Sequence, residues 1–277
     1  MSQQIILLRK GCRSLVNVIV LIKDIVDLTE IKVDPRTQRP ILAGLPRKIS
    51  DVDKRAVEAA VQLKEKHGGK VAVLSLGDDK TRTALREALA MGCDEAYLLK
   101  DPAFEGSDTL ATSRILAAAI RKIGEYDLIL CGEMTLDSLS AQVGPRVAEL
   151  LGLPQLTYVR SLDLKEGRVV AERDLEEEDE VVEAPMPALV TVVREINEPR
   201  IPSLMSIMRA SRKKIEEWDR EALGLSEGEV GSAGSAVEIL EVRAPKMERK
   251  KMIIEAETPE EAAERLVEKL MEEGVLR

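Results

Sequence analysis

The sequence is poor in the residues from which proteins build metal centres, disulfide networks and aromatic stacking surfaces. Its 277 residues include one histidine, three cysteines and 2% aromatic residues, with Phe104 and Trp218 each occurring once. The cysteines are widely spaced and form no CxxC pair, which argues against a structural metal site or a cysteine–histidine nucleophile. Aromatic stacking on nucleic-acid bases is equally disfavoured. The core must therefore be aliphatic, drawn from the 44% of residues that are hydrophobic.

The chain also lacks an excess of positive charge and a long apolar run. Its 41 basic and 50 acidic side chains give a net charge of −9, which argues against binding to a nucleic-acid backbone. No apolar run approaches the ~20 residues that a membrane-spanning helix needs, and the start of the chain has no signal-peptide pattern. We therefore expect a cytoplasmic protein with no nucleic-acid partner and no direct membrane insertion.

What the chain contains instead is an alternation of apolar runs and segments with helical periodicity. Each apolar run has the length of a buried strand, and glycine often follows it. The predicted strands span 16–22, 71–76, 95–99 and 127–131, and the predicted helices run from Asp51 or Asp53 to Lys66 and over 81–91, 108–123 and 140–151. This order predicts an α/β fold with a doubly wound parallel sheet, layered as in flavodoxin-like proteins.

The second half of the chain has a different texture. Strands are predicted at 156–164, 168–173 and 188–193, with the acidic residues 176–180 as a solvated hairpin turn, and a helix at 203–217 follows. Residues 224–234 are rich in Gly, Ser and Glu, which is typical of a flexible linker. Beyond it we predict a short strand near 237–242 and an amphipathic helix at 259–272.

These patterns predict three parts of the chain. Residues 1–15 form an N-terminal extension, 16–223 an α/β nucleotide-binding domain, and 224–277 a linker with a C-terminal docking arm. The arm has too little apolar surface to fold alone. We therefore expect it to pack on a partner subunit.

Three loops at the predicted carboxyl ends of strands have residues suited to a ligand, because open parallel sheets bind ligands there. The first contains Lys23, whose charge suits a phosphate, and the second contains Leu76 and Gly77, where the backbone can approach a ligand closely. The third runs from Gly132 to Pro145. No GxGxxG or Walker sequence is present, so the two commonest phosphate motifs are absent.

The third loop leads into a helix, whose first amides have no partner within the helix. The amides of residues 140–143 would form an anion cradle, and Asp137 would accept a hydrogen bond from a ribose hydroxyl or a backbone amide. The alternative is that Ser138 or Ser140 caps the helix and that the loop binds nothing. The residues alone leave both interpretations open.

At these positions the chain resembles the β subunits of electron-transfer flavoproteins. The resemblance rests on Ala56–Lys64, on Ala88–Ala96, on Asp127–Gly132 with Asp137–Pro145, and on Asn197–Arg200 followed by Leu204, Ile207 and Met208. It implies a fold that binds an adenine nucleotide, an α subunit as partner and an adenosine phosphate in the third loop. It also implies that Leu204, with Ile207 and Met208, docks onto redox partners.

Residues 101–113 resemble a segment of the electron-bifurcating members of that family. In such members this subunit holds FAD, which accepts a hydride from NADH and passes electrons to ferredoxin and to a quinone oxidoreductase or a dehydrogenase. Phe104 would then wall the flavin ring, with Asp108, Thr109 and Thr112 as polar contacts. The alternatives are a core position for Phe104 and a helix N-cap for Asp108, and AMP in place of FAD. The chemistry would belong to the flavin, so we predict no catalytic side chain.

Together these considerations define a set of predicted cofactor-binding residues. They are Lys23, Leu76, Gly77, Phe104, Asp108, Thr109, Thr112, Cys131, Gly132, Asp137, Ser140, Ala141, Gln142, Val143, Gly144 and Pro145. The chain departs from the family at Ser50–Asp53, at Glu133-Met134 and at Leu139, where the family commonly has Asn-Pro, Arg-Gln and a second acidic residue. A non-redox nucleotide-binding regulatory module is the alternative of another class, but it would not need the docking arm or the Leu204 segment.

Overall fold

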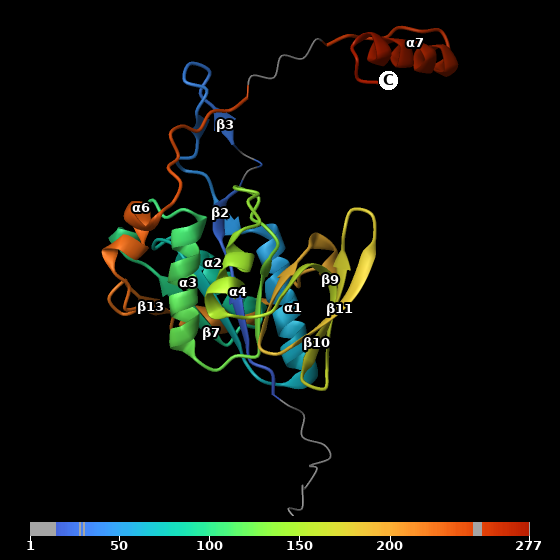
Figure 1. Ribbon diagram of the computed structural model, residues 1–277. Coiled ribbons are helices and arrows are strands. Elements are labelled where there is room, and N and C mark those ends of the chain that lie inside the picture. Colours follow the sequence, from blue (N-terminus) through green and yellow to red (C-terminus); the bar gives the residue numbers. More distant parts are fainter. Residues whose placement is uncertain (1–14, 28, 30, 246–250, 277) are drawn as a thin grey trace, which may run out of the picture. The chain divides into compact units, whose positions relative to one another are not determined.

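The computed structural model describes residues 15–27, 29, 31–245 and 251–276 (Figure 1). They form two compact units. The first unit consists of the chain up to Lys32 together with Ile41–Glu241, and the second consists of Val33–Pro40 together with the chain from Val242 onward. Residues 1–14 of the predicted N-terminal extension lie outside the described residues. The second unit includes the amphipathic helix α7 (Pro259–Glu272), which begins at the predicted residue because the Thr258 side chain caps it and Pro259 follows.

A nine-stranded sheet forms the centre of the first unit, in the order β11-β10-β9-β12-β8-β1-β6-β7-β13. The parallel strands are β1 (Val18–Leu21), β6 (Val71–Leu76), β7 (Glu95–Leu99), β8 (Leu128–Gly132), β12 (Ala188–Val192) and β13 (Glu216–Trp218). Strand β9 (Gln155–Lys165) continues the parallel sheet beside β12 and then turns back through β10 (Arg168–Asp174) and β11 (Asp179–Pro185) as an antiparallel hairpin arm.

Helices cover both faces of this sheet, which confirms the predicted doubly wound fold. They are α1 (Asp51–His67), α2 (Thr81–Met91), α3 (Thr109–Ile123), α4 (Val143–Leu151) and α5 (Leu204–Arg212). Alternate residues of β1 point to opposite faces: Val18 and Val20 pack in the core layer with α1 and α2, and Ile19 and Leu21 in the layer with α3 and α4. Every residue of β1 is buried, as expected for a central parallel strand. Figure 1 shows α3 and α4 side by side on one face.

The order of the strands places the topological switch point between β1 and β8. From β1 the chain passes to β6 and β7 on one side, and it then returns to β8 and β12 on the other. Neighbouring crossovers therefore lie on opposite faces, and in open parallel sheets this is the point at which ligands bind, at the carboxyl ends of the strands. The small antiparallel ladder of β2 (Asp24–Val26) with β5 (Arg47–Ile49) follows β1 at this end of the sheet. A second short ladder pairs β3 (Lys32–Val33) with β4 (Pro40–Ile41).

The predicted acidic turn is shorter than expected, because part of it belongs to a strand. Asp179 and Glu180 start β11, which pairs along its whole length with β10. Basic residues of the neighbouring strands hold these two acids: Arg160 Nη1 lies 3.1 Å from an Asp179 oxygen, and Arg173 Nη1 lies 2.7 Å from Glu180. Cross-strand charge pairs of this kind let an acidic segment extend a sheet.

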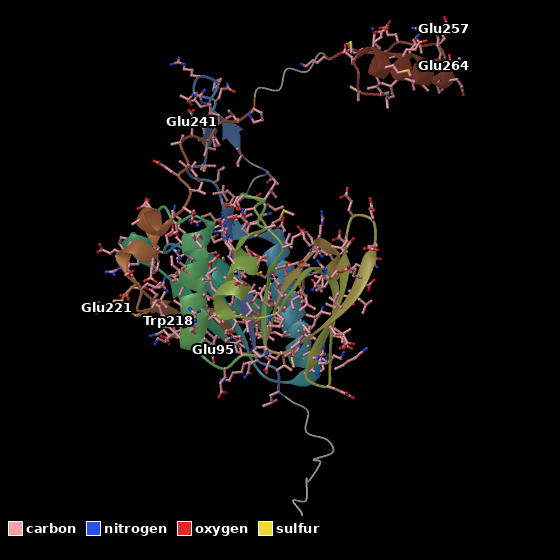
Figure 2. The ribbon with its side chains drawn as sticks, viewed as in Figure 1. Glu95, Trp218, Glu221, Glu241, Glu257 and Glu264 are labelled. Carbon is pink, nitrogen blue, oxygen red and sulfur yellow. The ribbon has the colours of Figure 1, made fainter. Side chains whose placement is uncertain are left out.

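The helix predicted at 203–217 is wrong beyond Arg212, where α5 ends. Arg86 donates to the carbonyl groups of Ala210 and Lys213 at that point, and the backbone of Lys213 is extended. The chain then adds β13 to the sheet edge beside β7. Trp218 of β13, labelled in Figure 2, packs its ring 4.6 Å from that of Tyr97 in β7, and the Tyr97 hydroxyl donates to Glu95 at 2.8 Å.

Three further predictions near ligand-binding or docking segments need correction. The helix predicted to begin at residue 140 begins at Val143, because Leu139 and Ala141 have positive φ angles of 50° and 52°. Among the described residues, no strand forms at 237–242. The predicted flexible linker at 224–234 is instead folded onto the first unit: it contains the turns η4 (Glu227–Glu229) and α6 (Gly231–Gly234), and Val230 is 2% exposed.

This packing predicts different outcomes for two truncations of the chain. Ending the protein at Leu223 removes Val230, which belongs to the same core cluster as Phe104. We expect such a variant to lose at least about 2 kcal/mol of unfolding free energy, the cost of emptying a core position. Ending it at Glu241 keeps that contact. Thermal denaturation of both proteins checks this, and equal melting temperatures would show that residues 224–241 do not stabilise the domain.

Candidate functional site

A buried carboxylate joins the two strand ends at the switch point. Asp53, in the first turn of α1, is 3% exposed. Its Oδ2 accepts a hydrogen bond from the amide of Lys23 at 2.8 Å, just after β1, and its Oδ1 accepts one from the amide of Gly132 at 2.9 Å, at the end of β8. A Cβ at Gly132 would lie 2.7 Å from that oxygen, so a side chain there would displace the carboxylate. Asp53 therefore fixes the spacing of the two loops.

The environment of Asp53 moves the pKa of its carboxyl group into the physiological pH range. Burial raises the pKa of its carboxyl group from the ordinary value of 3.8 to about 7, although the amides of Lys23 and Gly132 favour the charged form. The charge of Lys23 opposes the rise and that of Asp137 adds to it. The switch point thus holds a carboxyl group that titrates near neutral pH.

The first and third predicted loops meet in an ion pair. Lys23 Nζ lies 2.6 Å from Asp137 Oδ2, and the hydroxyl of Thr135 donates to Asp137 Oδ1 at 2.7 Å. Partial burial disfavours the charge of Asp137, but the ammonium group of Lys23 and the Thr135 hydroxyl hold its pKa below the ordinary value. The structure thus brings together two residues that were predicted separately, and it identifies Lys23 as the partner of Asp137.

Residues 140–144 present a row of backbone N–H groups beside this pair. In the part of the chain that the structure describes, none of these five amides donates to a protein acceptor. Gln142 is the N-cap of α4 but makes no side-chain cap, and the Ser138 hydroxyl lies 3.0 Å from that of Thr135. The alternative in which Ser138 or Ser140 caps the helix is therefore wrong. Free amides at a helix start favour an anion.

Gly144 lets the first turn of α4 lie directly on the sheet. A Cβ at this residue would lie 2.8 Å from Thr191 Cγ2 and 3.0 Å from Cys131 Sγ. Both neighbours are buried, and burial raises the pKa of the Cys131 thiol. Cys131 thus packs against the first turn of α4 and, being buried, has little surface that a ligand could contact. Val143 and Pro145 are half-buried in the same turn.

Of the four residues predicted in the segment before and within α3, only Thr109 reaches the third loop. Its hydroxyl donates to Gln142 Oε1 at 2.8 Å. Phe104 is 6% exposed and lies in the core, so it presents little ring surface to a cofactor. Asp108 caps α3, as its alternative interpretation holds. Thr112 is half-buried, and its amide donates to the Asp108 carbonyl at 2.9 Å.

The second predicted loop is engaged elsewhere. The amide of Gly77 donates to the carbonyl of Leu99 at 3.0 Å, and a Cβ on Gly77 would lie 2.1 Å from the Thr81 hydroxyl. That hydroxyl donates to Asp24, whose carboxylate also pairs with Arg47 at 2.8 Å. Across the described ranges, no hydrogen bond or ion pair joins Leu76 or Gly77 to Lys23 or to the third loop. The structure therefore separates the second predicted loop from the first and third loops, which lie together.

The predicted docking residues Leu204, Ile207 and Met208 belong to an exposed apolar surface on α5 and the chain just before it. We define the docking surface as Ile201, Leu204, Met205, Ile207 and Met208, all of them exposed. The Ser203 hydroxyl caps the helix by accepting from the amide of Ser206 at 3.2 Å.

A charge cluster holds the chain just before the docking surface. The guanidinium group of Arg200 donates to buried Glu58 at 2.8 and 3.1 Å and to Glu65 at 2.6 and 2.9 Å. The amide of Arg200 also donates to Glu58, at 3.1 Å. Two acids of α1 therefore fix the start of the docking segment.

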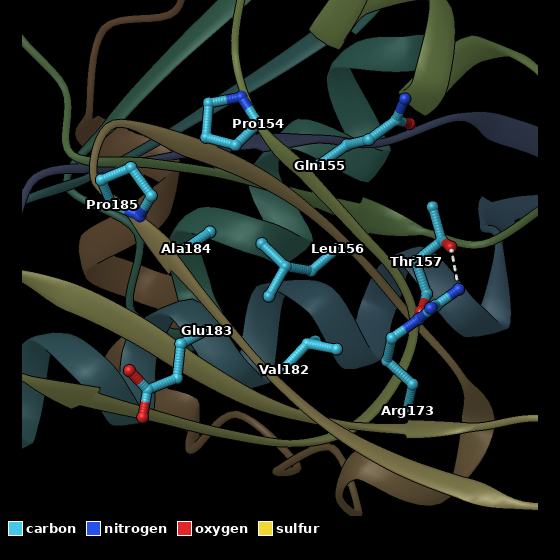
Figure 3. Close-up of a pocket in the computed structure, with 9 residues that line it drawn as sticks. All are labelled: Pro154, Gln155, Leu156, Thr157, Arg173, Val182, Glu183, Ala184 and Pro185. Carbon is cyan, nitrogen blue, oxygen red and sulfur yellow. Dashed lines mark hydrogen bonds between the residues drawn. The ribbon is translucent and has the colours of Figure 1, made fainter.

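Two hollows lie outside the amide row. The larger, of about 580 Å³, lies between β9 and β11, and Figure 3 shows that Arg173 in its lining is bonded to Thr157. Arg173 is also bonded to Glu180. It is lined near the amino-terminal end of β9, away from the ends where the predicted loops meet. The smaller, of about 330 Å³, is lined by Leu136 of the third loop, by the start of α1 and by Pro199–Ile201. It adjoins both the third loop and the docking surface.

Other kinds of site receive no support from the described ranges. Within them, no group of three or more His, Cys, Asp or Glu side chains is arranged to hold a metal ion. None of the helices there combines the length and the apolar character needed to cross a bilayer.

Sequence reasoning missed Asp53 and Glu58. Acidic residues in the first turn of a helix are common because they favour the helix dipole, so the position of Asp53 gave no signal of its bridging role. Glu58 lies on the buried face of α1, which the apolar periodicity assigned to the core. A charged residue at such a position is the one signal that could have identified it.

The fold and the loops at its switch point place the chain among the doubly wound α/β proteins whose ligands bind at the carboxyl ends of the strands. Comparison with known proteins defines it further. The electron transfer flavoprotein domain matches residues 41–223. An electron transfer flavoprotein β subunit of Thermoanaerobacterium thermosaccharolyticum is 41% identical over 94% of this chain and 100% of its own length.

Two further relatives have different names. Subunit CarD of the caffeyl-CoA reductase–Etf complex of Acetobacterium woodii is 38% identical over 94% of this chain and 99% of its own. Protein FixA of Bradyrhizobium diazoefficiens is 40% identical over 88% of each chain. The chain therefore belongs to the electron-transfer flavoprotein family.

The buried carboxylate predicts a pH dependence of stability that the variant Asp53→Asn should remove. Because the pKa is about 7 in the folded protein and 3.8 ordinarily, its stabilising contribution is complete below about pH 4 and is lost as the pH rises through 7. Between these values we expect the unfolding free energy of the wild type to fall, relative to the variant, by up to about 1.4 kcal/mol per pH unit.

Denaturant unfolding at several pH values measures this difference. The matched control is Asp163→Asn, which removes an exposed carboxylate paired with Lys66. Parallel pH profiles for the wild type and Asp53→Asn would show that Asp53 keeps an ordinary pKa.

Proposed function

We propose that this chain is the β subunit of a cytoplasmic electron-transfer flavoprotein and that it holds FAD at the switch point. Bound there, FAD would accept a hydride from NADH and pass electrons to ferredoxin and to a quinone oxidoreductase or a dehydrogenase. The row of free amides at residues 140–144 is the observation that carries the nucleotide site. The resemblance of residues 101–113 to a segment of bifurcating members supports FAD.

The residues at the switch point would divide the work of binding. The amides of the third loop and the start of α4 would hold a phosphate, where the helix dipole also favours negative charge. Lys23 would add a positive charge at the edge of the same site, since it is half-exposed and 2.6 Å from Asp137. Asp137, which is also partly exposed, has an oxygen able to accept from a ribose hydroxyl.

AMP is the second candidate ligand, and the burial of Phe104 favours it. A phosphate, a ribose and an adenine need only the amide row and the charged pair. A flavin ring needs an apolar or aromatic surface in addition, and Phe104 at 6% exposure gives little of it. In this alternative the chain would be an ordinary β subunit with structural AMP, beside an α subunit that holds the single FAD.

The described surfaces support a partnership with an α subunit and with redox proteins. Helix α7 of the second unit carries an exposed apolar stripe that includes Leu266, Val267 and Met271. We propose that this stripe packs on the α subunit and that the docking surface meets the electron acceptors. The non-redox regulatory module is disfavoured, because the chain belongs to a family of electron-transfer proteins.

The flavin and nucleotide content of the purified αβ complex decides between FAD and AMP. We expect two FAD and no AMP per heterodimer if the subunit bifurcates electrons. Denaturing the complex, followed by chromatography of the released nucleotides against standards, measures both. One FAD with one AMP would establish the ordinary subunit and exclude the bifurcating function. Absence of both nucleotides from this subunit would refute the proposed site.

The docking surface predicts a selective defect for Leu204→Ala. The side chain is 73% exposed, so its loss should leave the melting temperature and the bound nucleotide unchanged. Electron transfer to the downstream protein acceptor should slow by about ten-fold, the cost of a well-packed interface anchor. Val181→Ala is the matched control, because Val181 in β11 is also 73% exposed. Loss of nucleotide from Leu204→Ala, or equal rates for both variants, would contradict the docking role.

A further inference from the structure

Asp108 connects the start of α3 to residues that follow 128 and 129 positions later. Its Oδ1 accepts from the amides of Leu110 and Ala111 at 2.9 Å each, which caps the helix. Its Oδ2 accepts from the amides of Ala236 and Val237 at 2.8 and 3.2 Å. Burial disfavours the charge, yet these four N–H groups hold the pKa of Asp108 below its ordinary value. One carboxylate therefore serves two segments.

We call residues 226–237 the root segment, because the chain continues from it to the second unit at Val242. The segment contacts the turn η2 (Pro102–Phe104) at its middle: a Cβ on Gly231 would lie 2.3 Å from the carbonyl oxygen of Ala103. The amide of Gly231 donates to the Ser107 hydroxyl at 3.0 Å. Buried Val230 belongs to the same core cluster as Phe104.

Polar contacts hold the end of the root segment as well. The amide of Asp108 donates to the Ser235 hydroxyl at 2.8 Å, and Arg114 donates to the carbonyl of Gly234 at 3.0 Å. The Ser235 hydroxyl also lies 2.7 Å from the carbonyl of Gly231. Residues 103–114, part of which the sequence had linked to a flavin ring, thus bind the root segment along its length.

Thr109, the residue after Asp108, bonds to the start of α4, beside the amide row. The Thr109 hydroxyl donates to Gln142 at 2.8 Å, and Gln142 is the N-cap of α4. The Ser113 hydroxyl donates to the Thr109 carbonyl at 2.6 Å and lies 3.5 Å from that of Val143. The starts of α3 and α4 are therefore joined where the free amides lie.

We propose that Asp108 and Thr109 are positioning residues that couple the nucleotide site to the root segment. A phosphate on the amides of residues 140–144 would fix the first turn of α4 and, through Gln142 and Thr109, the start of α3. Asp108 then holds Ala236 and Val237 more firmly, because the bound phosphate has already ordered the start of α3 and so met part of the entropy cost of these bonds. Thermodynamic linkage requires the reverse as well: loosening the root segment lowers nucleotide affinity by the same factor. This inference rests on the proposed nucleotide site.

Hydrogen exchange of the full-length chain, with and without AMP and separately FAD, tests the coupling. Nucleotide binding is measured on the same samples by equilibrium dialysis. We expect the amides of Ala236 and Val237 to exchange about five-fold more slowly, or slower still, when the nucleotide is bound, the lower end of typical coupling between sites. Binding without any change at these two amides would overturn the coupling and leave the nucleotide site intact. Absence of binding would overturn the proposed site and this inference with it.

The variant Ser235→Ala tests the reverse direction. It removes the hydroxyl that accepts from the Asp108 amide and lies 3.0 Å from the Gly106 carbonyl. The variant leaves the amide row in place, as well as the bonds by which the Asp108 side chain caps α3. We expect its nucleotide dissociation constant to rise about three-fold or more, because the variant loses at least one hydrogen bond of the root segment. We also expect nucleotide protection of Ala236 and Val237 to decrease. Ser211→Ala removes a hydroxyl that bonds one carbonyl at the end of α5 and should leave both unchanged. Equal nucleotide affinity and protection in Ser235→Ala and the wild type would contradict the linkage.

Discussion

The candidate site depends on the contact between Asp53 and the two strand ends at the switch point. In a parallel sheet buried on both faces, the loops that bind ligands lie at the carboxyl edge, and they need contacts there to hold their positions. Here Asp53 of helix α1 supplies these contacts. The carboxylate accepts the amides of Lys23 and Gly132 at 2.8 and 2.9 Å. Lys23 then reaches Asp137 in the third loop, and the amides of residues 140–144 that follow have no acceptor among the described residues. Without the Asp53 carboxylate, the buried amide of Gly132 would lack a partner, a cost of about 1–3 kcal/mol, and the partly buried amide of Lys23 would lose its bond.

Helix α1 also supports the second functional surface. Five residues after Asp53, Glu58 accepts the backbone amide and the guanidinium group of Arg200, where the chain enters the docking segment. Burial disfavours the charge of Glu58, but the hydrogen bonds from Arg200 hold its pKa below the ordinary value. Both contacts come from a single rigid element, so the third loop and the start of the docking segment have a common frame. A disturbance of α1 would therefore reach both regions.

The sequence predicted the layers of the fold better than its edges. Apolar runs such as Val18–Leu21 specify buried parallel strands by themselves. A glycine marks the end of each of the helices α1 to α4. Strands β11 and β13 were missed because their pairing depends on distant partners, such as Arg173 for Glu180 and Tyr97 for Trp218. The root segment resembled a flexible linker in composition, but two of its glycines, Gly231 and Gly234, are required by close packing, because a Cβ at either position would clash with neighbouring backbone. At the site, Asp137 and residues 140–144 were predictable from helix-start chemistry, whereas the bridging role of Asp53 appears only when two strand ends converge.

The scarcity of aromatic residues has a consequence for spectroscopy. Trp218 is the sole tryptophan, and it lies in the edge strand β13 against Tyr97 with the ammonium group of Lys122 5.3 Å from its ring. Intrinsic tryptophan fluorescence therefore reports on the attachment of the last strand to the sheet. Unfolding curves recorded by tryptophan fluorescence report on the loss of this edge strand. They agree with curves recorded by circular dichroism only if the edge and the switch point unfold together.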